Sequence, residues 1–64
     1  MSANYQARAE EEASLMLAKL AGDMEHVAIR LPVLLAHKEH ADHNAEQLRG
    51  AAACVRKWAE KLKP

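Results

Sequence analysis

The sequence is poor in aromatic residues, which fill the cores of many small proteins, and in cysteine, which crosslinks many small folds. Its 64 residues contain no phenylalanine, one tyrosine, one tryptophan, two glycines and two prolines. The only cysteine is Cys54, which excludes a disulfide within the chain and is typical of a reducing compartment, so we expect a cytoplasmic location. Because chains of this size bury only about 60% of the surface that they expose when unfolded, stability has to come from regular helix packing, a metal or self-association.

An excess of charge of one sign and a long apolar run are also lacking. Nine basic and nine acidic residues give a formal net charge of zero, which provides no general attraction to nucleic acid. The longest apolar stretch, Val27 to Ala36, is interrupted by Arg30 and Pro32 and falls short of the ~20 residues that span a bilayer. The first residues contain no apolar signal core. We therefore expect no membrane partner and no secretory signal.

The residues that are abundant favour helices. Hydrophobic residues make up 50% of the chain, mostly alanine and leucine, and stand beside many glutamates and lysines. These are the strongest helix formers, whereas residues that favour strands are scarce. The composition predicts an all-α chain, and we expect residues 1–64 to form a single helical domain.

Two helices are predicted in the first two thirds of the chain. Apolar residues spaced by three and four predict an amphipathic helix over about residues 4–21. Gly22 and Asp23 then suit a helix end and the N-cap of a new helix. The next helix, over about residues 24–42, is apolar on nearly every side and is expected to be buried, with a kink or break at Pro32.

A third helix is predicted over about residues 45–62. Asn44 followed by Gln47 resembles a capping box at its start. Apolar residues then alternate spacings of four and three, which is a heptad pattern. We predict that this seam mediates self-association, through Ala45, Leu48, Ala52, Val55, Ala59 and Leu62.

Two architectures are compatible with these segments. In the first, turns at Gly22-Asp23 and near residues 42–44 give a bundle of three helical segments. In the second, the only turn lies at Leu31-Pro32, and two long helices form a hairpin that dimerises into a four-helix bundle. The apolar stripe keeps its phase through Gly22, which favours the second, whereas polar turn chemistry favours the first. We predict the first.

The histidines are the most conspicuous candidates for chemistry. His37, His40 and His43 are spaced by three, so on a helix successive side chains are rotated by ~60°. Zinc requires three or four ligands in a tetrahedral array, which this trio cannot supply within one chain. We predict no metal and no cofactor, and leave open a metal shared across a subunit interface.

No catalytic constellation is apparent. Cys54 has no neighbouring base in the sequence, and neither a phosphate-binding glycine loop nor a nucleophile elbow is present. The chain is therefore expected not to be an enzyme and to have no catalytic residues.

The leading functional hypothesis is a non-enzymatic interaction protein. It would form a dimer or larger assembly and bind a larger protein as a regulator or inhibitor, with Trp58, Arg56 and Lys57 as possible partner contacts. The alternative is a nucleic-acid-binding regulator that uses the basic C-terminal helix. Its basic residues are scattered around the helix, with Glu46 and Glu60 among them, so nucleic acid is the less favoured partner.

Overall fold

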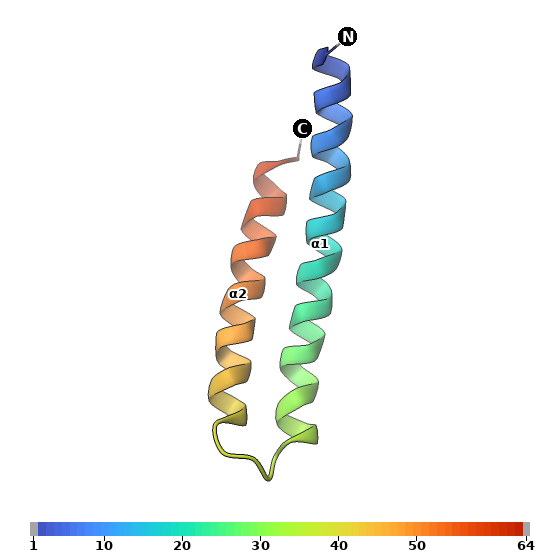
Figure 1. The fold of residues 1–64 in the computed structure, drawn as a ribbon. Helices are drawn as coiled ribbons and strands as arrows, with labels where there is room; N and C mark the ends of the chain where they lie inside the picture. Colours follow the sequence, from blue (N-terminus) through green and yellow to red (C-terminus); the bar gives the residue numbers. More distant parts are fainter. Residues whose placement is uncertain (1, 64) are drawn as a thin grey trace.

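The computed structural model describes residues 2–63 of the chain, with the side chains of residues 5–63, as two antiparallel helices joined by a short loop (Figure 1). Helix α1 comprises Ser2–Leu34 and α2 comprises Ala41–Lys61, and no strand occurs over the described residues. The hairpin measures 55 × 14 × 11 Å, so it is a single layer of helices. The all-α prediction is confirmed. The three-segment prediction is wrong, and the helical hairpin that was its alternative fits.

The expected turn at Gly22-Asp23 does not form, because α1 continues through both residues. Gly22 has a negative φ, so it does not use the left-handed conformation that ends a helix at glycine. The carboxylate of Asp23 accepts a hydrogen bond from the Nζ of Lys19, one turn earlier, at 3.5 Å. Both residues therefore lie inside the helix, because glycine and aspartate permit a turn but do not impose one.

Of the kink or break expected at Pro32, the break is absent. Helix α1 runs through Pro32 without interruption and ends at Leu34, so the chain does not turn at Leu31-Pro32 (Figure 1). Proline lacks a backbone N–H and so removes one hydrogen bond of the helix. Because Pro32 lies only two residues before the helix end, few other hydrogen bonds of α1 are affected. The backbone N–H of Leu35 still donates to the carbonyl of Leu31, at 2.7 Å.

The chain reverses in residues 35–40. The N–H of Lys38 donates to the carbonyl of Leu35 at 2.8 Å, and His40 adopts a left-handed conformation with φ 66°. Helix α2 therefore starts at Ala41, and the N–H of Asn44 already donates to the carbonyl of His40, at 2.8 Å. The capping box predicted at Asn44 is wrong, because that residue lies inside the first turn of α2.

Small residues at intervals of seven form the contact between the helices. The buried residues of the described chain are Ser14, Ala21 and Ala28 on α1 and Ala45, Ala52 and Ala59 on α2. The hydroxyl of Ser14 donates to the carbonyl of Ala59 at 2.7 Å, which fixes the register. Stepping by seven residues in opposite directions from this bond places Ala21 beside Ala52 and Ala28 beside Ala45. The two helices thus meet along a line of methyl groups.

Candidate functional site

The seven-residue repeat divides the rest of the hairpin into two sides. In each helix, residues three positions after a buried residue lie on one flank of the contact, and residues four positions after lie on the other. Because the helices are antiparallel, equal offsets in α1 and α2 fall on the same side of the hairpin. The side with offset four carries charged residues such as Glu25 and Arg56, beside the exposed Leu15 and Ile29, and we call it the polar side. On the side with offset three, the residues three and six positions after a buried residue are all uncharged.

An ion pair spans the polar side. Arg56 and Glu25 each lie four residues after a buried alanine, and the Nη2 of Arg56 is 2.7 Å from Oε1 of Glu25. A second hydrogen bond, from Nε of Arg56 to Oε2 of Glu25, measures 3.2 Å. The side-chain hydrogen bond to Glu25, reinforced by its negative charge, raises the pKa of Arg56 above its usual value. The guanidinium therefore keeps its charge, and the pair marks which flanks of α1 and α2 share a side.

The apolar side carries most of the large hydrophobic residues of the hairpin. The residues three positions after a buried residue are half-buried, except Leu31, which is 38% exposed. The residues six positions after a buried residue lie further from the helix contact and are exposed. We call this surface the apolar face. It comprises Leu17, Leu20, Met24, Val27, Leu31 and Leu34 of α1 and Leu48, Val55, Trp58 and Leu62 of α2.

A shallow pocket of about 130 Å³ confirms that the two helices contribute to one face. Residues from both helices and the loop line it, namely Leu31, Leu35, Ala41, Asn44, Ala45 and Leu48. Next to the loop, the apolar face therefore spans both helices and is hollowed.

The residues predicted for self-association are divided by this arrangement. Ala45, Ala52 and Ala59 are buried against α1 of the same chain, so in this hairpin they leave no surface for a second chain. Leu48, Val55 and Leu62 are half-buried on the apolar face. Self-association stays a prediction, and the residues available for it are the large ones rather than the alanines.

The three predicted partner contacts do not form one cluster. Trp58 lies on the apolar face and is 57% exposed, whereas Arg56 is held by Glu25 on the polar side. Lys57 is exposed and lies five residues after Ala52, which directs it away from α1. Sequence reasoning did not assign Leu20, Val27 and Leu34 to an interaction surface, although their own seven-residue spacing could have revealed them.

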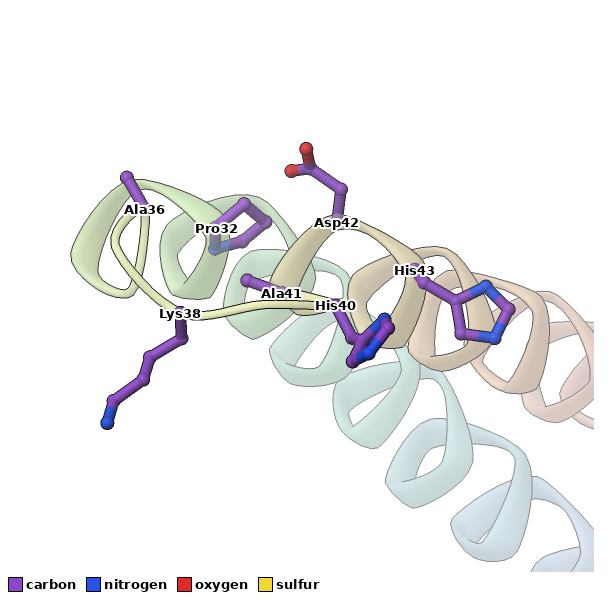
Figure 2. A pocket seen from close by; sticks show the side chains of 7 residues that line it. All are labelled: Pro32, Ala36, Lys38, His40, Ala41, Asp42 and His43. Atoms are coloured by element: carbon purple, nitrogen blue, oxygen red, sulfur yellow. The ribbon is translucent and has the colours of Figure 1, made fainter.

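The histidines do not lie on one helix, so the geometry expected for the trio is wrong. His37 and His40 belong to the loop, and only His43 lies in α2. An open pocket of about 350 Å³ is lined by His40 and His43 together with residues that include Lys38 and Asp42, whose side chains point away from each other and from the imidazoles (Figure 2). Among the described residues, no three His, Cys, Asp or Glu side chains lie close enough to hold a metal ion.

The basic stretch of α2 is partly neutralised within the chain. Besides the Arg56 pair, Nη1 of Arg49 lies 3.8 Å from Oε1 of Glu46, and Nζ of Lys63 lies 3.4 Å from Oε1 of Glu60. A phosphate group would have to compete with these carboxylates. Arg49, Arg56 and Lys63 are therefore each paired with a carboxylate of the same chain.

Comparison of the chain with protein-family models, with curated proteins and with solved structures found no match. Over the described residues, neither helix combines the length and the apolar character needed to cross a membrane. The function has therefore to be inferred from the surfaces of the hairpin.

Proposed function

We propose that this chain is a non-enzymatic interaction protein that buries its apolar face against other polypeptides and thereby regulates or inhibits a larger protein. The observation that carries the proposal is that large apolar side chains of both helices lie on one side of the hairpin, whereas other exposed apolar residues, such as Leu15 and Ile29, lie on α1 alone. Leu20, Leu34 and Trp58 are 48%, 58% and 57% exposed. Contiguous apolar patches above a few hundred Å² are rare on monomeric proteins and mark interaction surfaces.

The chemistry of the face favours a protein as the occupant. The residues that make up the face are all uncharged, and Trp58 offers a large amphipathic anchor. Depletion of charge around an aromatic anchor is typical of the centre of a protein interface. Nucleic acid would instead need the basic residues of α2, of which Arg56 is held by Glu25. The exposed thiol of Cys54 fits a reducing, cytoplasmic setting.

Site-specific photo-crosslinking in cells tests the proposal. A benzophenone amino acid at position 20 lies on the apolar face, and the same group at position 15 is a matched control. Leu15 is on the same helix and is 67% exposed, but it lies one residue after Ser14 and so on the polar side. Covalent adducts with polypeptides are expected from position 20 and not from position 15. Equal yields from the two positions, or no adduct from either, would contradict the proposal.

A further inference from the structure

We infer that a second copy of this chain covers the apolar face, so that two hairpins form a four-helix bundle. The inference rests on the proposed function, because it names the first polypeptide that the face binds. It differs from self-association through the alanine seam, since Ala45, Ala52 and Ala59 stay buried within each chain.

The exposed area of the hairpin is the first argument. Its accessible surface is 5267 Å², whereas area scaling gives about 4,100 Å² for a folded monomer of 7.1 kDa. The excess of about 1,200 Å² exceeds the roughly 800 Å² that each partner buries in a standard protein interface. Part of this excess lies on the N-terminal turns of α1 that extend beyond α2 (Figure 1), and a second copy of the same face would cover the part that lies along the paired helices.

The thinness of the core is the second argument. The described residues bury only alanines and Ser14, so the hairpin contact removes little apolar area from water. The half-buried Leu17, Leu48 and Val55 are open on the side away from the helix contact. Since the hairpin is a single layer of two helices, these side chains need a second layer to be enclosed. A second hairpin supplies that layer, as in four-helix bundles.

The face also complements itself. On this side of the hairpin, the residues at offset six are large on α1, at Leu20 and Val27, and smaller on α2, at Asn44 and Ala51. Trp58 is the large residue of this row on α2, and it lies near the level of the small Ala13. A two-fold axis parallel to the helices would lay α1 of each chain over α2 of the other. Leu20 would then face the small Ala51, and Trp58 would face the small Ala13. Large side chains over small ones allow the two layers to interdigitate.

Sedimentation of the full-length chain at micromolar concentration, with two matched variants, tests the inference. The unmodified chain should sediment as a dimer. Leu20→Asp should weaken dimerisation about a hundredfold or more, because the substitution enters a symmetric interface twice, whereas Leu15→Asp should leave the dimer intact. Trp58 is the only tryptophan, so its emission should shift to the red on dilution as the dimer dissociates.

Each contrary outcome is informative. A monomer that unfolds cooperatively, or a dimer that Leu15→Asp disrupts as strongly as Leu20→Asp, would overturn the inference. If Leu20→Asp fails to fold, Leu20→Ala replaces it, and its dimer should dissociate at a higher protein concentration than the dimer of Leu15→Ala. If the chain is a monomer but still forms adducts with another protein from position 20, the dimer inference is wrong and the proposed function is retained.

Discussion

Replacing Gly22 by alanine should stabilise the protein. Gly22 lies in the interior of α1 with a negative φ, and a Cβ built on it meets no atom within 4 Å. The methyl group therefore adds neither strain nor a clash, and the change restricts the unfolded chain. Glycine in a helix interior is less favourable than alanine by about 0.8–1 kcal/mol, so Gly22→Ala should raise the free energy of unfolding by about that amount per chain.

Urea denaturation followed by circular dichroism measures this gain, and a melting curve should shift upward by roughly 4–8 °C for each kcal/mol. Gly50→Ala is the matched control in α2, where a Cβ also meets nothing within 4 Å, and the two gains should add because they lie on different helices. The sign of the effect reports the topology. If the chain turned at Gly22 in a left-handed conformation, alanine there would be strained, and a loss of stability would refute the continuous α1.

Three further substitutions test the helix contact and the loop. Ala52→Leu should lower the free energy of unfolding by about 1–3 kcal/mol in urea denaturation, because Ala52 is fully buried between the helices; an unchanged stability would mean that the helices do not meet there. Ser14→Ala should cost about 1 kcal/mol in the same assay and not more, since the carbonyl of Ala59 still accepts from the N–H of Leu62; no loss at all would show that the interhelix bond is not formed in solution. His40→Gly should raise the melting temperature, because a left-handed conformation costs about 1–2 kcal/mol for a residue with a Cβ; a lower melting temperature would contradict the positive φ.

The heptad pattern of α2 was the part of the fold that sequence reasoning predicted best. The spacing of Ala45, Ala52 and Ala59 predicted a helix with those residues on its contact side, and all three are buried. The partner of that side could not be predicted, because a heptad pattern is the same whether the opposite helix belongs to the same chain or to another.

The contact side of α1 was missed for a physical reason. The spacing that predicted the first helix includes large apolar residues such as Met16 and Leu20, which remain exposed, whereas the structure buries Ser14, Ala21 and Ala28. When two helices approach closely, the residues between them are selected for small size, and a serine can satisfy its hydroxyl on the opposite backbone, as Ser14 does on Ala59. Hydrophobicity alone therefore identifies the wrong flank of α1.

The short loop explains why the alanine rows are buried between α1 and α2 whereas the leucines stay exposed. Residues 35–40 connect α1 directly to α2, so the two alanine rows meet at an effective concentration in the millimolar range, far above that of a second chain at micromolar concentration. The intrachain contact therefore takes the rows that permit the closest approach. What remains on the open side is the row of Leu20, Val27 and Leu34, whose bulk is useful only against a further layer. Folding and assembly should thus depend on different residues, with Ala52 controlling the hairpin and Leu20 controlling its occupant.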